Sequence, residues 1–173
     1  MFLLLISCSH QQDTGQVHPQ YFSLTEFFNQ EIARLDSQSL YLYRTVRIGS
    51  KVSETIDSTP EWKEEFSLFQ DCDINKPELV SDYSVDSVIQ GNERHYLYEN
   101  ISATNRVSNI HVYWKNNSLP ELIEITVKEK NYFKDEEFVY SYQPSLAIGV
   151  MGTRKNLTSE ENEFEILSEI RKK

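Results

Sequence analysis

Basic residues are scarce in this chain of 173 residues, which has 17 Lys and Arg against 27 Asp and Glu and a formal net charge of −10. An acidic body repels phosphate backbones, so we expect no nucleic-acid partner. The same charge argues against broad electrostatic adhesion to anionic membrane surfaces. The length suits one domain built around a single core.

Cysteine is also rare, because Cys8 and Cys72 are the two in the chain. If Cys8 is lipid-modified, as argued below, Cys72 has no partner for an internal disulfide. We expect Cys72 to fill a small apolar space at a helix end. A reactive thiol is the alternative, and it requires a lowered pKa.

The sequence lacks the motifs of common catalytic and metal sites. It contains no Gly-x-Ser-x-Gly elbow, no glycine-rich phosphate loop of either common type, and no His-x-x-x-His or Cys-x-x-Cys pair. We therefore expect no enzyme, no catalytic residue, no cofactor and no metal. His95 and His111 lie on neighbouring predicted strands and could meet across a sheet. They are interpreted as two surface histidines, with a metal or acid–base pair as the alternative.

No apolar run reaches the roughly 20 residues that a membrane-spanning helix needs. Residues 1–7 are apolar, however, and they end in Leu5-Ile6-Ser7-Cys8, which resembles a bacterial lipobox. The resemblance implies cleavage before Cys8 and acylation of its thiol and its new amino group, which anchors the chain stably. Because no Lys or Arg precedes the run, residues 1–7 are interpreted as an incomplete signal peptide.

Residues 8–20 are polar and show no helix or strand period, which predicts a flexible lipid-anchored tether. Ser9 after the cysteine resembles an outer-membrane sorting signal, and the single acidic residue Asp13 favours the periplasmic face over the cell surface. His10 and His18 lie in this tether and are interpreted as solvated polar residues.

Residues 107–130 contain two arms, 109–114 and 123–128, that alternate apolar and polar side chains with the period of two that a half-buried strand requires. Asn116, Asn117, Ser118 and Pro120 between them predict a turn, and so a hairpin. Similar alternation predicts strands within residues 40–56, 83–89, 93–101, 138–142, 146–150 and 164–170. Residues 131–137 and 156–162 are predicted loops, and the last three residues are expected to fray.

Two helices are predicted in the N-terminal half of the chain. Ser23 and Glu26 form a capping box that opens a helix within residues 21–38, with an apolar stripe at Leu24, Phe27, Phe28, Ile32 and Leu35. Pro60 opens a short second helix with Trp62, Phe66 and Phe69 on its buried side. The spacing of Asp71, Asp73 and Asn75 begins like an EF-hand loop, but Lys76 replaces the required glycine, so we interpret these residues as a helix stop.

The elements together predict an α+β fold for residues 21–173: two helices packed on a curved, mostly antiparallel sheet of about seven to nine strands. The pattern Trp62-x-x-x-Phe66-x-x-Phe69, followed by Asp73-Ile74-Asn75-Lys76-Pro77, resembles uncharacterised small lipoproteins of Bacteroidota-type bacteria over roughly residues 21–170. That resemblance implies an envelope protein and no known activity or site.

The sequence therefore indicates a lipid-anchored, non-enzymatic cell-envelope protein on the outer membrane, facing the periplasm, that binds a hydrophobic ligand or an envelope partner. An accessory protein–protein interaction subunit is one alternative. An envelope hydrolase is another, and it needs two carboxylates about 5–10 Å apart in a cleft. A deep apolar cavity between helices and sheet favours the ligand, whereas a filled core favours the accessory subunit. Ligand-binding candidates, which equally suit the rim of a core, are Tyr96, Tyr98, Tyr113, Tyr140 and Tyr142.

Overall fold

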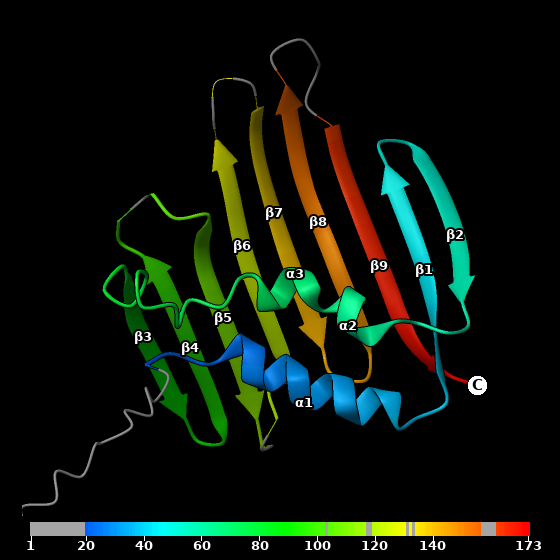
Figure 1. Ribbon diagram of the computed structural model, residues 1–173, viewed down its shortest axis with the longest axis horizontal. Coiled ribbons are helices and arrows are strands. Elements are labelled where there is room, and N and C mark those ends of the chain that lie inside the picture. The colour runs from blue at the N-terminus through cyan, green and yellow to red at the C-terminus, as the bar shows by residue number, and fades with distance from the viewer. Residues whose placement is uncertain (1–19, 103, 117–118, 131, 133, 157–161) are drawn as a thin grey trace, which may run out of the picture.

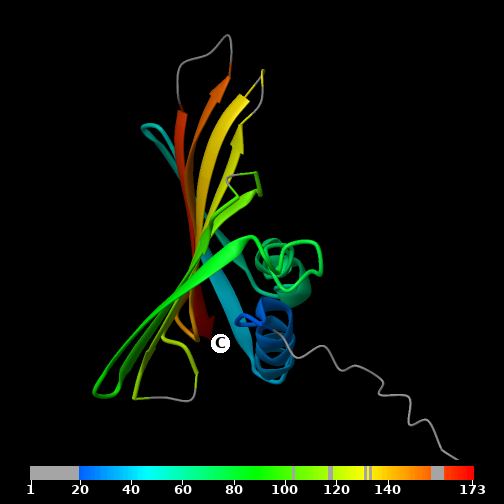
Figure 2. The ribbon, with the colours of Figure 1, turned by 90° about the vertical axis from the view of Figure 1, so that its left-hand side faces the viewer.

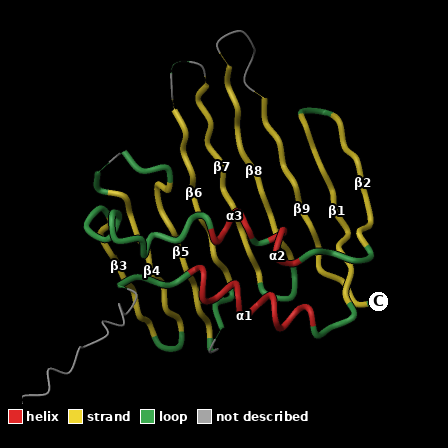
Figure 3. Tube along the Cα trace, in the orientation of Figure 1, coloured by secondary structure: helices red, strands yellow, loops and turns green. Residues whose placement is uncertain are grey.

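Nine antiparallel strands form one open sheet, and three short helices lie against one of its faces (Figures 1 and 3). The computed structural model describes residues 20–102, 104–116, 119–130, 132, 134–156 and 162–173. The predicted antiparallel sheet is confirmed, with nine strands. Within these residues the chain is mostly β, and its helices number three rather than the two expected.

The strands are β1 (Leu40–Ile48), β2 (Lys51–Asp57), β3 (Tyr83–Gln90), β4 (Glu93–Asn100), β5 (Val107–Lys115), β6 (Leu122–Lys130), β7 (Lys134–Gln143), β8 (Ala147–Asn156) and β9 (Asn162–Lys172). Their spatial order is β2-β1-β9-β8-β7-β6-β5-β4-β3. Every strand from β3 to β9 therefore pairs with its sequence neighbour. Strands β1 and β2 also pair with each other, but their hairpin joins the rest of the sheet next to the last strand, through the pairing of β1 with β9.

The hairpin β5–β6 lies near the middle of the sheet and shows how alternation sets its two faces. Ile110 is paired with Ile125, and Val112 with Ile123. All four side chains are buried toward the helices. Their sequence neighbours point to the opposite face, as the period of two requires. The hairpin predicted within residues 107–130 is confirmed, and both strands extend beyond the alternating residues by one or two positions at each end.

Helix α1 (Leu24–Asp36) starts where the capping residue was predicted. The Oγ of Ser23 accepts a hydrogen bond from the amide of Glu26 at 3.1 Å. A second cap comes from a distant loop, because the Oδ2 of Asp73 accepts from the amide of Thr25 at 2.7 Å. Asp73 also accepts from the amide of Asn75 at 2.9 Å. Burial raises the pKa of Asp73, but these hydrogen bonds outweigh it and hold the pKa below its usual value.

The predicted second helix is divided into two short ones, α2 (Trp62–Glu65) and α3 (Ser67–Gln70). Phe66 lies between them with a backbone (φ −97°, ψ 0°) that departs from a regular helix. The prediction that Trp62, Phe66 and Phe69 form the buried side of this segment is nevertheless confirmed, because all three are buried. The divided segment keeps all three rings on the sheet side.

Aromatic rings fill the space between the helices and the sheet. Tyr142 of β7 is fully buried, and its ring lies 5.4 Å from that of Phe28 and 4.9 Å from that of Phe66. Its hydroxyl donates to the buried carboxylate of Glu31 at 2.5 Å, and Arg34 donates two further hydrogen bonds to the same carboxylate. Burial, followed by this carboxylate, raises the pKa of Tyr142, so its hydroxyl keeps its proton.

The predicted bounds of three strands were wrong. Strand β8 runs from Ala147 to Asn156 rather than over residues 146–150, because it pairs with β7 as far as Asn156. Strand β7 begins at Lys134 rather than Phe138, because its first residues pair with β8 on one side and, from Asp135, with β6 on the other. Ion pairs accompany this pairing: Lys130 contacts Asp135 at 2.6 Å, and Arg154 contacts Glu136. Strand β9 runs to Lys172 instead of fraying, since it pairs with β1 from Phe164 to Lys172.

The double role of Asp73 predicts that Asp73→Ala lowers the free energy of unfolding by about 1–3 kcal/mol at pH 7, because two amides lose their acceptor. A depressed pKa contributes stability above the unfolded value and loses it as the pH falls. The difference from wild type should therefore shrink below about pH 4. Urea unfolding at several pH values measures it. Asp86→Ala, at an exposed position of β3, is the matched control, and equal losses in the two variants would contradict this account.

Gly152 and Gly149 both lie in β8. Replacing them with alanine should lower the free energy of unfolding by unequal amounts. A Cβ at Gly152 would collide with the backbone oxygen of Glu137 and lie 2.8 Å from Cδ1 of Phe138. A Cβ at Gly149 would collide with the Oγ of Ser141, a hydroxyl that can rotate away. We expect Gly152→Ala to cost about 1–3 kcal/mol of unfolding free energy and Gly149→Ala clearly less. Thermal unfolding compares them, and the reverse ranking would show that the strand backbone yields more easily than this packing implies.

Candidate functional site

One face of the sheet carries the helices, and the other, called the open face here, carries none in the described chain (Figure 2). The open face presents the alternate residues that point away from the core. Along its middle strands these include His111 and Tyr113 of β5, Glu124 and Lys128 of β6, and Val139 of β7. It is therefore a broad surface of mixed charged, aromatic and apolar side chains.

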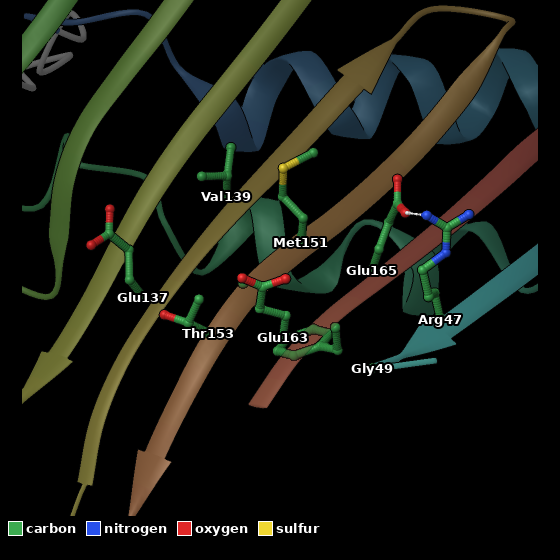
Figure 4. Close-up of a pocket in the computed structure, with 10 residues that line it drawn as sticks. Arg47, Gly49, Glu137, Val139, Met151, Thr153, Glu163 and Glu165 are labelled. Atoms are coloured by element: carbon green, nitrogen blue, oxygen red, sulfur yellow. Dashed lines mark ion pairs between the residues drawn. The ribbon is translucent and has the colours of Figure 1, made fainter. Parts of the chain in front are cut away.

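A shallow hollow lies on the open face where β1, β9, β8 and β7 run side by side (Figure 4). Its volume is about 490 Å³. Val139, Met151 and Thr153 lie near its centre. Its charged border consists of Arg47, Glu137, Glu163 and Glu165. The hollow combines an apolar centre with an acidic border.

Some of these border charges already have partners at the surface. Arg47 lies 3.6 Å from Glu165, and Lys128 lies 3.4 Å from Glu137. Both pairs are about half exposed, so they contribute little to stability and can exchange for another charged group at low cost. The hollow is thus suited to a basic or polar side chain from another macromolecule.

A second cluster lies on β4, β5 and β6 of the same face. The Nδ1 of His95 lies 3.2 Å from the Nε2 of His111, and the two rings are almost parallel, at 8°. Tyr113 stacks on His95 with ring centroids 4.5 Å apart. The carboxylate of Glu124 lies 3.8 Å from the Nδ1 of His111. The sequence-based expectation that these two histidines could meet across the sheet is confirmed.

The five tyrosines predicted as ligand contacts do not form one surface. Tyr98, Tyr140 and Tyr142 are buried on the side of the helices. Tyr96 packs against that core beside Trp114, with ring centroids 5.5 Å apart. Tyr113 lies on the open face, against His95. Four of the five therefore belong to the core or its rim, which was the alternative interpretation.

Cys72 is buried in the core, and the acidic loop around it contacts the start of α1. Cys72 is 1% exposed, and burial raises the pKa of its thiol to about 11, which leaves it protonated and unreactive at neutral pH. The small apolar filler predicted at a helix end is confirmed. Asp73 and Asn75 contact the start of α1: Asp73 accepts from the amide of Thr25, and Asn75 accepts from the amide of Tyr21 at 2.9 Å. Within the described residues, no group of three or more His, Cys, Asp or Glu is arranged to hold a metal.

A second hollow of about 660 Å³ lies between two loops at one end of the sheet. Leu119 and Pro120 border it from the β5–β6 loop, and Pro144 and Leu146 from the β7–β8 loop. Leu119 and Leu146 are 41% and 64% exposed. This hollow is outside the core, so it does not hold a ligand between helices and sheet.

The residues of the hollow on the open face were not predicted from the sequence. Alternation places Glu137, Val139, Met151 and Glu165 on one face, and this signal was present. The nearness of Arg47, however, depends on the pairing of β1 with β9, which joins segments more than one hundred residues apart. Local sequence patterns do not predict such a pairing.

No protein-family model, curated protein or solved structure matches this chain. The predicted lipidation site Cys8, the tether and its histidines His10 and His18 lie outside the described residues. Among the residues that are described, no helix has the length and apolar character needed to cross a bilayer.

Proposed function

We propose that this protein is a lipid-anchored, non-enzymatic component of the cell envelope that binds a partner protein through the open face of its sheet. The lipobox-like Leu5-Ile6-Ser7-Cys8 supports the anchor, on the outer membrane and facing the periplasm. The helices brace the opposite face, as the expected α+β packing implies. The protein is then an accessory subunit whose rigid sheet presents a recognition surface.

The observation that carries this proposal is the contrast between the two faces. The space between helices and sheet is occupied by side chains such as Phe28, Phe66 and Tyr142. The centroids of these three rings lie 4.8–5.4 Å apart, so the rings are in contact. A protein that carries a hydrophobic ligand needs an apolar cavity, usually of some hundreds of Å³, to hold that ligand. This packing favours the partner-binding form of the hypothesis over the ligand-carrying form.

The chemistry of the open face indicates the kind of partner. The hollow has an acidic border around Met151, and the chain as a whole has a net charge of −10. Complementary charges steer association and set specificity. A partner that presents Lys or Arg beside an apolar residue fits this hollow best.

Lipidation is tested by labelling cells with radioactive palmitate. We expect the wild-type chain and Cys72→Ser to incorporate label and to sediment with membranes. Cys8→Ser should do neither, because acylation needs the thiol at that position. Label in the Cys8→Ser variant, or an unlabelled wild type released from membranes, would remove the anchor from the proposal.

Partner binding is tested with a photo-reactive amino acid placed at Met151 on the open face or at Leu68 on α3, which are 48% and 41% exposed. In intact envelopes we expect a discrete crosslinked adduct from position 151 and none from position 68. The double charge reversal Glu137→Lys with Glu163→Lys should abolish the adduct, because it removes the acidic border.

The matched control is Glu61→Lys with Glu64→Lys, which changes the net charge equally on exposed residues at the start of α2. It should leave the adduct intact. Adducts that form mainly from position 68, or that survive the reversal in the hollow but not the control reversal, would place recognition on the helix side instead.

A further inference from the structure

We propose that His95 and His111 together bind one divalent ion of a late first-row transition metal, of the copper, nickel and zinc class, on the open face of the sheet. The site is separate from the acidic hollow, since it lies on β4 and β5 rather than on β7, β8 and β9.

The distance between the two histidines fits two ligands of one ion. Imidazole nitrogens bind Zn²⁺ at about 2.0–2.1 Å, and a tetrahedral angle then separates two such nitrogens by about 3.3 Å. The Nδ1 of His95 and the Nε2 of His111 are 3.2 Å apart. Without metal, one proton between these nitrogens makes an N–H···N hydrogen bond. An ion bound by both nitrogens displaces this proton to solvent and lies to one side of the line that joins them, because bonds of about 2.0–2.1 Å do not fit on that line.

Glu124 favours the tautomer of His111 that metal binding needs. It is paired directly opposite His111, and its carboxylate lies 3.8 Å from Nδ1. A negative charge there favours the proton on Nδ1 and leaves the lone pair of Nε2 directed at His95. A carboxylate behind a histidine ligand is the usual outer-shell arrangement of protein metal sites.

The strands hold the two rings in place before any ion arrives. His95 lies between Val88 of β3 and Tyr113 of β5, and the tyrosine ring stacks on it at 4.5 Å. Beside them, Glu93 and Lys115 form an ion pair at 3.2 Å. Preorganised ligands lose little conformational entropy on binding, and the acidic chain attracts cations.

Two protein ligands leave the remaining coordination positions to water or to a donor from another molecule. Binding is therefore exchangeable, and soft or borderline ions with an affinity for imidazole are selected. The expected order is Cu²⁺ tightest, with Ni²⁺ and Zn²⁺ weaker. Mg²⁺ and Ca²⁺ prefer oxygen ligands and should not bind here.

The test is isothermal titration calorimetry of the full chain with Zn²⁺ and Ni²⁺ at neutral pH, with Mg²⁺ as the negative control. We expect one saturable site per chain. His95→Asn and His111→Asn should each weaken it at least tenfold, since each removes one of two ligands. Glu124→Gln should weaken it about tenfold through the lost outer-shell carboxylate.

The chain has four histidines, and the other two supply the matched control. The double variant His10→Asn with His18→Asn should bind as the wild type does. The proposal is overturned if this variant loses binding, if His95→Asn and His111→Asn both keep it, or if no saturable binding occurs up to about 1 mM metal ion. Circular dichroism of each variant separates a lost ligand from a lost fold.

Discussion

The antiparallel pairing of β1 with β9 is the contact on which the rest of this structure depends. It joins the first strand to the last, so that the N-terminal hairpin extends the sheet instead of ending the molecule as a separate unit. The pairing runs from Leu40 opposite Lys172 to Ile48 opposite Phe164. It also brings Arg47 to the acidic side chains of β9, which completes the hollow on the open face.

Local patterns predicted most of the strands, because alternation along one strand needs no knowledge of its partner. The two strands within residues 107–130 could be assigned in this way, and so could the turn at Gly49, whose φ of +56° suits glycine. Charged segments were harder to assign. Lys134 to Glu137 resembles a loop by composition, yet it forms a strand because β6 and β8 pair with it from both sides.

Tertiary contacts decided what local patterns could not. The loop at Asp73 resembles either a calcium loop or a helix stop, and its actual role is to cap a helix some fifty residues earlier. Among the tyrosines, sequence spacing could not separate core from surface, since the face of each strand that meets the helices depends on where α1 packs. The meeting of His95 with His111 was foreseeable, because the short β4–β5 connection brings adjacent strands together. The 3.2 Å separation of their nitrogens was not.

The two borders of the sheet are unlike each other, and this difference limits how copies of the chain can assemble. Both border strands expose apolar side chains, but β3 has Asp86 as its one charged residue, whereas β2 carries Lys51, Glu54 and Asp57. Contact between two β3 borders closes after two molecules, whereas contact of β3 with β2 leaves a free border at each end and builds either a ring or an open filament. Charges on β2 act against that open-ended growth, in the way that edge strands of natural sheets avoid aggregation.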